Sequence, residues 1–464
     1  MTASPSPSTD FTETLMGSDG MSRREFVKDA AAAGAFTIVP AHVLGGGQQA
    51  PSEKLNVACI GVGGMGRQDV RGVTDAVENV VAMCDVDEEA AEESFRLHPD
   101  ARRYKDFREM LAKETDLDAV TVSTPDHTHA VITLAALRAG KHVYTQKPLV
   151  RTLTEARTVR DEAASRPDQI TQMGNQGHAG EGVRVMREWV EAGLIGTVRE
   201  VHFWTNRPIW PQGLLRPTEL HAPRPTFEWD LWLGPAQERP YNPAYAPFRW
   251  RGWWDFGTGA LGDMACHLMD AAYWILDLGY PTSIEAECSR VFHETAPNSS
   301  RVVYHYPARN GRPGVTIVWR DGSLVPRRPA EWPAKDPWPF AADGGQLWIG
   351  EDGKMVAGTY SQDPRLLDAD KMRAVKETPL EPRYPRTEGV YKEWLAAIRA
   401  GRKSGSDFAT YAAGFTEMVL LGCLAQRMHT RIDVDPRTGD VLTEVPQEWV
   451  SPPYRSGWEA VARG

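Results

Sequence analysis

A glycine-rich turn that follows directly on a short apolar run constrains this fold more than any other feature of the sequence. Residues 55–60 are apolar and β-prone, and the turn G-V-G-G-M-G at 61–66 leads into a helix-compatible stretch. Strand, G-x-G-x-x-G turn and helix in this order are typical of a dinucleotide-binding unit. Gly61 permits the tight turn, Gly63 lets backbone N–H groups approach a pyrophosphate, and Gly66 lets the helix pack on the strand. A strand-to-helix corner that binds nothing is the alternative.

Two further apolar runs extend this unit. The run 80–84 ends at Asp85, close to the spacing at which an acidic side chain accepts hydrogen bonds from the ribose hydroxyls of a dinucleotide. A carboxylate there disfavours a 2′-phosphate, so the sequence predicts NAD rather than NADP. The run 119–123 leads into Thr124-Pro125, where a nicotinamide ribose would lie. Together the three runs predict an α/β Rossmann domain that binds NAD.

Composition narrows the classes of partner. The chain has 464 residues and a net charge of −10, which argues against nucleic acid or an anionic membrane as the main partner. Its length predicts two domains and a leader. The five cysteines are scattered singly through apolar sequence without a C-x-x-C spacing, which indicates buried thiols.

The N-terminus carries an arginine pair in the context of an export signal. Residues 22–28 read S-R-R-E-F-V-K, and a weakly apolar stretch follows at 30–44 with a small-residue cleavage motif at 39–41. This order predicts a twin-arginine signal, export to the periplasm as a folded protein, and no stable membrane insertion, because the apolar stretch is too short to span. An amphipathic helix with an Arg pair is the alternative. Since the twin-arginine route carries folded proteins, we expect the nucleotide to be loaded before export and to stay tightly bound.

Turn-forming and linker-like segments along the chain predict its domain boundaries. We expect a signal and linker over 1–52, the Rossmann domain over 53–176, a substrate and oligomerisation domain over 177–430, and a tail over 431–464. The second domain is expected to be α+β with a large, open, mostly antiparallel sheet. Its predicted strands lie near 197–203, 284–291, 302–306 and 315–319, and its predicted helices at 178–193, 260–278, 389–398 and 408–428.

Seven of the sixteen tryptophans fall within residues 201–260, interleaved with Pro and Arg. One explanation is a loop held on the sheet by packed Trp and Pro side chains. The other is a pocket wall whose aromatic faces stack on the C–H surfaces of a sugar. The sequence leaves both open.

A lysine follows the strand-like run 142–145. Lys147 stands before Pro148, and a positive charge beside a nicotinamide would stabilise alkoxide character on a substrate oxygen. NAD⁺ would in turn push this ammonium toward proton loss. The alternative is a solvated lysine in a turn that precedes a proline.

The predicted helix 260–278 carries three polar side chains on one face. The spacing of four and then three aligns Asp263, His267 and Asp270. A carboxylate that accepts from one imidazole nitrogen would leave the other free to exchange a proton with a hydroxyl. A stripe facing water is the alternative. A metal site built from His127, His129, Asp263 and His267 is a further alternative, but no tight ligand motif such as H-E-x-x-H occurs, so no metal is predicted.

These motifs together resemble a known family. From about residue 53 to 430 the chain resembles the Gfo/Idh/MocA oxidoreductases, and specifically their members exported with a twin-arginine signal. The resemblance rests on the glycine turn and on C-D-V-D at 84–87, S-T-P-D-H-T-H at 123–129, A-G-K-H-V-Y-T-Q-K-P-L at 139–149 and G-D-M-A-C-H-L-M-D at 262–270. It implies a Rossmann domain, an open-faced α/β domain, and pairing into dimers or tetramers through that sheet.

The resemblance also implies site residues. In the family a lysine and an Asp and His four apart line the substrate side of the nicotinamide, which implies catalytic roles for Lys147, Asp263 and His267. The family's usual glutamate before the lysine is Gln146 here, and the Y-P-T-H-G segment of its glycosidases is not evident. The residues expected at the nucleotide are Gly61, Gly63, Gly64, Met65, Gly66, Asp85, Ser123, Thr124, Pro125, His129, Gln146 and Lys147.

The sequence thus predicts an exported NAD-dependent oxidoreductase that oxidises a secondary hydroxyl of a sugar, cyclitol or glycoside. Lys147 would polarise the reacting oxygen, His267 would accept the proton, and Asp263 would orient His267. Two alternatives remain. One is a redox-neutral glycosidase or epimerase, and the other is a non-catalytic sugar-binding protein that keeps the fold.

Overall fold

The computed structural model describes residues 54–340 and 343–459. The predicted export signal lies outside the described residues. The chain divides into two units, 1–54 and 55–464, and the fold below is that of the second unit.

The first sheet is a Rossmann sheet. Its six parallel strands lie in the order β3-β2-β1-β4-β5-β6. The strands β1, β2 and β4 are the three apolar runs, and they are almost continuously buried because helices cover both faces of a parallel sheet. The strands are β1 (Asn56–Ile60), β2 (Asn79–Cys84), β3 (Arg102–Tyr104), β4 (Ala119–Val122), β5 (His142–Thr145) and β6 (Thr171–Met173), and the helices α2 (Gly66–Asp75), α3 (Glu88–Leu97), α4 (Phe107–Lys113), α5 (Asp126–Arg138) and α6 (Leu153–Ala164).

The second sheet has eight strands in the order β13-β12-β11-β7-β10-β9-β8-β14. Among the pairs in the described residues only β7 and β10 run parallel, so the predicted mostly antiparallel sheet is confirmed. Sequence patterns located β7 (Val198–Thr205), β8 (Ser283–Cys288), β9 (Ser300–Tyr306) and β10 (Val315–Arg320). They missed β11 (Gly344–Gly350), β12 (Lys354–Gly358), β13 (Arg365–Leu366) and β14 (Ile432–Asp433).

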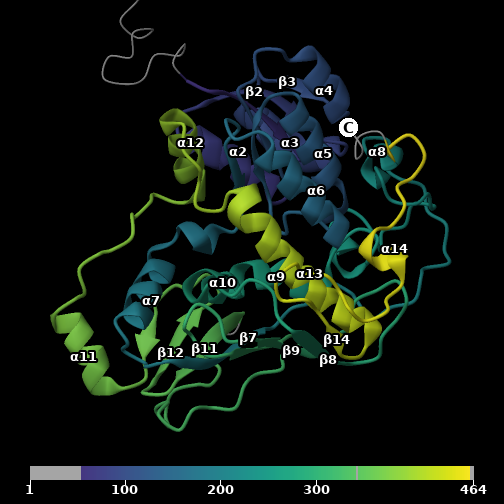
Figure 1. The fold of residues 1–464 in the computed structure, drawn as a ribbon. Helices are drawn as coiled ribbons and strands as arrows, with labels where there is room; N and C mark the ends of the chain where they lie inside the picture. The colour runs from purple at the N-terminus through teal and green to yellow at the C-terminus, as the bar shows by residue number, and fades with distance from the viewer. Residues whose placement is uncertain (1–53, 341–342, 460–464) are drawn as a thin grey trace, which may run out of the picture. The chain divides into compact units, whose positions relative to one another are not determined.

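Helices cover the face of this sheet that is turned toward the Rossmann domain. Figure 1 shows α9 (Gly259–Leu268), α10 (Asp270–Leu276) and α13 (Ala413–Met428) stacked there. The π-helical turn η4 (Phe408–Ala412) leads into α13, and Asp407 caps it by accepting from the backbone N–H of Thr410. The segment Phe408–Met428 is long and apolar enough to cross a membrane, with a mean hydropathy of 1.4, but 78% of it is buried inside the protein. It therefore serves as a core helix between the two domains. The remaining helices are η2 (Gln176–Ala179), α7 (Glu181–Glu191), α8 (Trp229–Leu233), η3 (Arg249–Gly252), α11 (Ala369–Glu377), α12 (Val390–Ala400) and α14 (Gln447–Val450).

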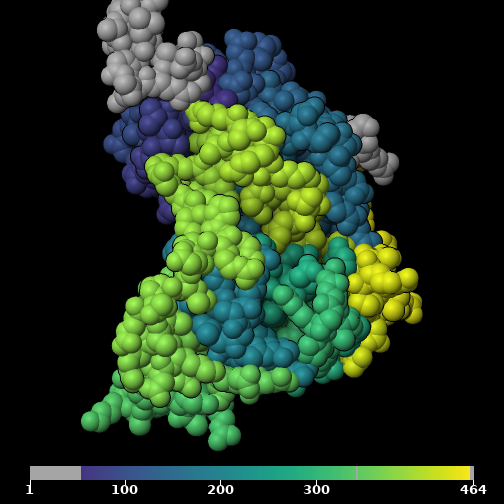
Figure 2. All heavy atoms as spheres, turned by 60° about the vertical axis from the view of Figure 1, so that its left-hand side comes forward, coloured from purple at the N-terminus to yellow at the C-terminus, as the bar shows by residue number. Residues whose placement is uncertain are grey.

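One late helix returns to the first domain. In Figure 2 the yellow-green chain around α11 and α12 runs along the outside from the second sheet up to the Rossmann domain. There Trp394 is fully buried, and the ring of Tyr144 lies 5.6 Å from its ring and 5.4 Å from that of Tyr391. A helix that the sequence assigned to the second domain thus completes the core of the first.

Some tryptophans of the 201–260 segment pack in an aromatic cluster and others line a cleft, while stacking on a sugar stays a prediction. Trp253 packs in an aromatic cluster with Tyr245 and is 1% exposed. Trp210 and Trp250, by contrast, line the large cleft described below. Of the five cysteines, Cys59, Cys84, Cys266 and Cys423 are buried as expected, whereas Cys288 is half-buried because it ends β8.

Candidate active site

A cleft of about 940 Å³ lies between the two domains. The glycine turn and Asp85 line it, and so do Lys147, Asp263 and His267. The strand ends of a Rossmann sheet and the helix α9 of the second domain thus meet around one space. This is where ligands bind in open α/β sheets.

The glycine turn has the geometry expected of a phosphate cradle. Gly61 has φ +76°, and a Cβ on it would come within 2.8 Å of the backbone of Ser123. A Cβ on Gly66 would overlap the carbonyl oxygen of Gly61, so close helix–strand packing requires this glycine. In the described part of the chain no side chain caps α2 at Met65, so its first N–H groups suit an anion.

Gly63 and Gly64 both line the cleft. A Cβ on Gly63 would lie 2.9 Å from the Cβ of Ala90, so its packing against α3 also requires a glycine. Gly64 is the more open position, with φ +48° and no atom within 4 Å of an added Cβ. The approach of a pyrophosphate to Gly63 stays a prediction.

Asp85 lies at the end of β2 and lines the cleft. Its Oδ2 accepts from the backbone N–H groups of Val62 (2.8 Å) and Gly63 (3.0 Å), and its Oδ1 accepts from that of Asp87 (2.9 Å). Burial raises the pKa of this carboxyl to about 6 although these three donors oppose the shift. Asp85 thus braces the glycine turn in this structure, and its contact with a ribose stays a prediction.

Most other residues expected at the nucleotide line the cleft, but Gly66 and His129 do not. Ser123, Thr124, Pro125 and Gln146 all lie on its wall. His129 is 1% exposed, and its two ring nitrogens lie 2.8 Å from the carbonyl oxygens of Thr124 and Pro148. His129 can therefore influence a bound nucleotide only indirectly, by holding the loops that contain Thr124 and Pro148 in place.

The alternative metal site does not form. The Nε2 of His127 lies 2.9 Å from the carbonyl oxygen of Trp232, away from Asp263 and His267. Within residues 54–340 and 343–459, no group of at least three His, Cys, Asp or Glu side chains could hold a metal ion.

Lys147 and Asp263 form a buried ion pair. The Nζ of Lys147 lies 3.0 Å from both the Oδ1 and the carbonyl oxygen of Asp263, and the Nε of Arg251 lies 3.4 Å from the same Oδ1. Burial acts to raise the pKa of Asp263, but the charges of Lys147 and Arg251 outweigh it and lower that pKa to about 2. Asp263 is therefore ionised at neutral pH.

His267 faces the same cleft without a carboxylate partner. Its buried Nδ1 has no hydrogen-bond partner among the described residues, and its ring packs edge-on against Tyr360 with centroids 4.7 Å apart. Burial and the charge of Lys147 hold the pKa of the imidazole well below 6.5. The expectation that Asp263 orients His267 is wrong, because Lys147 and Arg251 take up that carboxylate.

Family models match both domains of this chain. The model described as "Oxidoreductase family, NAD-binding Rossmann fold" matches residues 55–174, and the model described as "Oxidoreductase family, C-terminal alpha/beta domain" matches residues 181–320. Together they cover more than half of the chain. The chain belongs to the Gfo/Idh/MocA family.

Relatives of this Gfo/Idh/MocA protein include cyclitol dehydrogenases. The inositol 2-dehydrogenase/D-chiro-inositol 3-dehydrogenase of Lacticaseibacillus casei is 34% identical over 158 residues, which are 33% of this chain and 45% of that protein. The inositol 2-dehydrogenase 3 of Saccharopolyspora erythraea is 31% identical over 34% of this chain and 47% of its own length. The chain thus spans less than half the length of these curated relatives.

Solved structures share the fold of this Gfo/Idh/MocA protein. A levoglucosan dehydrogenase in complex with NADH has a TM-score of 0.57 and 17% identity, over 82% of this chain and 99% of that one. The myo-inositol dehydrogenase from Lactobacillus casei, in complex with NAD(H) and myo-inositol, has a TM-score of 0.55 and 18% identity, over 85% and 99%. At these identities the likeness shows a common fold.

Asp270 does not line the cleft with Asp263 and His267. The helix expected over 260–278 is interrupted at Met269, and Asp270 begins the second part, α10. Asp270 instead accepts from the Nδ2 of Asn175 (2.7 Å) and from the Tyr411 hydroxyl (2.8 Å), and it lies 3.1 Å from the Nδ1 of His178. In this Gfo/Idh/MocA protein Asp270 therefore belongs to a buried polar network and not to the cleft.

The His178–Asp270 pair should make stability depend on pH. Burial acts to lower the pKa of His178, but the charge of Asp270 and its hydrogen bond outweigh it and raise that pKa above 6.5. A raised imidazole pKa stabilises the fold below the unfolded value, and this contribution is lost as the pH rises through the folded pKa. We expect the unfolding free energy of His178→Asn to fall furthest below wild type near about pH 6 and to approach it near about pH 9. The exposed control His221→Asn should follow wild type, and a pH-independent gap for His178→Asn would contradict the prediction.

Gln146 has a partner that explains why it is not a glutamate. Its Nε2 lies 2.8 Å and 3.1 Å from the two carboxylate oxygens of Asp69, which also accepts from the hydroxyls of Ser123 and Tyr391. Asp69 is fully buried, and burial raises its pKa although these donors oppose the shift. A glutamate at position 146 would face this carboxylate directly. Gln146 therefore stabilises the wall of the cleft through its hydrogen bonds to Asp69, and it does not tune the charge of Lys147.

We expect Gln146→Glu to lower the free energy of unfolding by about 2–3 kcal/mol at neutral pH, because a donor to a buried carboxylate becomes a second acid. Protonation of one of the two acids relieves the repulsion, so the loss should shrink as the pH falls. Thermal unfolding between about pH 5 and about pH 8 measures both effects. The exposed control Gln237→Glu should unfold like wild type, and an equally stable Gln146→Glu would rule out this role.

Sequence reasoning missed several residues of the cleft. Arg207, Arg251 and Tyr360 line it beside His267, and Asp126 lies on the wall near Lys147. Burial and the charge of Asp263 raise the pKa of Asp126 to about 7. The only available signal was the tryptophan-rich and arginine-rich composition of 201–260, which points to a pocket wall without naming its polar members.

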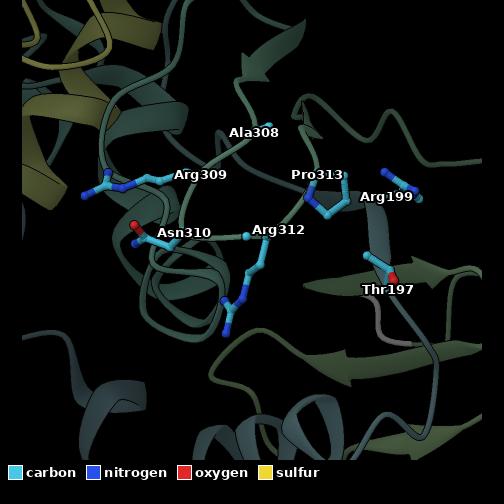
Figure 3. A pocket seen from close by; sticks show the side chains of 8 residues that line it. Thr197, Arg199, Ala308, Arg309, Asn310, Arg312 and Pro313 are labelled. Carbon is cyan, nitrogen blue, oxygen red and sulfur yellow. The ribbon is translucent and has the colours of Figure 1, made fainter.

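A second hollow of about 480 Å³ lies at the β9–β10 turn of the sheet domain. Figure 3 shows Arg309, Asn310 and Arg312 on one side of it and Thr197 and Arg199 on the other. Arg309 donates to the carbonyl oxygen of Leu278 and Arg312 to that of Ile275. These two hydrogen bonds tie the β9–β10 turn to the C-terminal end of α10.

Proposed function

We propose that this protein is an exported oxidoreductase that oxidises a secondary hydroxyl of a sugar, cyclitol or glycoside with a tightly bound NAD. One observation carries the proposal. Lys147 and His267 line the same cleft as the glycine turn, although they come from different domains. The cyclitol dehydrogenases among the relatives support the substrate class.

The residues of the cleft fit a dinucleotide. The open Gly64 and the uncapped N-terminus of α2 suit a pyrophosphate, and Asp85 lies where a ribose would bind. Arg224 lies beside Asp87 and Glu89, which already neutralise it, and this favours NAD over NADP. A nicotinamide bound beside Lys147 and His267 would supply the hydride acceptor.

Three side chains of the cleft would then have separate roles in the oxidation of the hydroxyl. Lys147 donates to the substrate oxygen and stabilises the negative charge that develops on it. His267, neutral at neutral pH, accepts the hydroxyl proton at a ring nitrogen. Asp263 is a positioning residue, because its contacts keep the Lys147 ammonium on the wall of the cleft.

One experiment tests the cofactor and the reaction together. The protein is denatured as isolated, and any released nucleotide is identified with its redox state. The intact protein is then titrated with neutral and acidic sugars and cyclitols while nicotinamide absorbance is followed. Bound NAD and a substrate-dependent absorbance change are expected. A protein that carries no nucleotide and binds none when it is added would contradict the proposal.

Product analysis separates net oxidation from redox-neutral chemistry. Accumulation of a keto sugar supports the oxidoreductase. Cleavage of a glycoside, or epimerisation, with no net oxidised sugar would support the glycosidase or epimerase alternative instead. A sugar-binding protein without activity would show neither.

Export and assembly complete the proposal. The arginine pair Arg23-Arg24 and the following apolar stretch support twin-arginine export, and replacement of both arginines by lysine should retain the protein in the cytoplasm. The second sheet has one face not covered by α9, α10 and α13, and it supports a homodimer or tetramer formed there. Light scattering of the purified protein measures that assembly.

A further inference from the structure

The half of the cleft that faces His267 is rich in positive charge. Lys147, Arg207 and Arg251 line it, and Asp263 is the carboxylate that two of them share. Burial and the charge of Asp263 raise the pKa of Asp126 to about 7, so this acid carries only part of a negative charge at neutral pH. Three cations therefore face a single fully ionised acid.

Arg207 stands out because no carboxylate pairs with it in the described part of the chain. Its guanidinium donates to the Oδ1 of Asn206 at 2.6 Å, and its backbone N–H donates to the Thr205 hydroxyl oxygen. The side chain is half-buried, and it is close enough to His267 for its charge to lower the pKa of that imidazole. A partly desolvated cation without a counter-charge is costly unless a ligand neutralises it.

Arg251 is held with donors still available. Its guanidinium carbon lies 4.3 Å from the centroid of the Trp250 ring and 5.0 Å from that of Phe248, and its Nη1 donates to the carbonyl oxygen of Phe248. No residue in 54–340 or 343–459 bonds its Nη2. The aromatic rings fix the plane of the guanidinium, which favours a planar, bidentate acceptor.

The excess of positive charge around His267 affects the proposed reaction. Oxidised nicotinamide brings one more positive charge into the same space, and His267 must then accept a proton beside Lys147 and Arg207. An anion on the substrate would neutralise Arg207 and make the protonated imidazole less unfavourable. A neutral sugar would leave Arg207 without a counter-charge beside the protonated His267.

We infer that the substrate is an acidic sugar or cyclitol, and that Arg207, assisted by Arg251, binds its carboxylate beside the reacting hydroxyl. The inference rests on the proposed function and deepens it by naming the substrate class. A carboxylate is planar and negatively charged, so it can accept two parallel hydrogen bonds from a guanidinium group. A sugar phosphate shares the anionic chemistry and is distinguished by the experiment.

The test compares matched ligands on the NAD-loaded full-length protein. Methyl glycosides of glucose, galactose and mannose are each titrated beside the corresponding uronate and 6-phosphate by calorimetry. We expect at least one uronate to bind about ten- to hundredfold more tightly than its neutral parent, as for a charge-assisted hydrogen bond. Arg207→Gln should remove most of this preference, and Arg207→Lys should keep part of it. The side chain of Arg207 bonds only its neighbour Asn206 among the described residues, so these variants should fold.

The exposed Arg373→Gln in α11 is the matched control and should keep the preference of wild type. Uronates that bind no better than their neutral parents, or a preference that survives Arg207→Gln, would overturn the inference. An Arg207-dependent preference for the phosphates would overturn the choice of carboxylate. If the uronates bind through Arg207 but no ligand changes the nicotinamide absorbance, the acid site stands and the proposed function fails.

Discussion

Lys147→Met should lower kcat/KM for the oxidised substrate by about a thousandfold, within the range for loss of a group that assists proton transfer. The variant loses the ammonium that polarises the reacting oxygen. It also leaves Asp263 with the guanidinium of Arg251, at 3.4 Å, as its remaining partner in the described structure. The nucleotide should stay bound, because the glycine turn is unchanged. Single-turnover nicotinamide absorbance and the amount of nucleotide in the purified variant measure the two effects.

The pH profile of Lys147→Met gives a second readout. The charge of Lys147 is one of the causes that lower the pKa of His267, so its removal should raise that pKa. Since the proposed base works when it is neutral, the acidic limb of residual kcat/KM should move to higher pH. Lys113→Met, which removes an exposed lysine from α4, should keep the rate and the profile of wild type. Turnover of Lys147→Met close to wild type would refute the role of this lysine.

Gly66→Ala should abolish or severely weaken nucleotide binding. The new Cβ would overlap the carbonyl oxygen of Gly61, so α2 must move away from β1. That movement opens the phosphate turn and disturbs the core, at a cost of about 2–3 kcal/mol. A loss of this size corresponds to about a hundredfold weaker binding. Calorimetric titration with NAD and the nucleotide content of the purified variant measure it.

Gly353→Ala is the matched control for this prediction. A Cβ on Gly353 meets its nearest atoms at 3.7 Å or more, which is ordinary van der Waals contact, and Gly353 lies in the second domain. Its nucleotide content should equal that of wild type. If Gly66→Ala binds NAD as wild type does, the glycine turn is not a phosphate cradle.

The local order of residues was enough to predict the nucleotide-binding strands of the first domain, but not the contribution of α12 to its core. The glycine turn, Asp85 and Lys147 all follow directly on strands, and side chains at the ends of parallel strands meet at one edge of the sheet. The strand β11 escaped prediction because its sequence G-G-Q-L-W-I-G contains three glycines and has no alternation. It becomes a strand through its antiparallel pairing with β7, a contact that only the folded chain provides.

The helix period placed Asp263 and His267 correctly on one face but could not assign their partners. Lys147 reaches Asp263 across 116 residues of sequence and so displaces the expected contact to His267. Arg207 belongs to no periodic pattern or motif, since it lies in the chain after β7. Its importance comes from what surrounds it in space, which is why sequence reasoning missed it.

The return of α12 to the Rossmann domain limits how this protein can be dissected. An N-terminal fragment that ends near residue 176 would lack Trp394 and Tyr391, and the face formed by Tyr144 would be exposed to water. Such a fragment should aggregate or misfold even though it contains every strand of the nucleotide-binding sheet. A chimera that exchanges the substrate-binding half for that of a relative must therefore keep this late segment with its native first half, and its junctions belong on either side of α12.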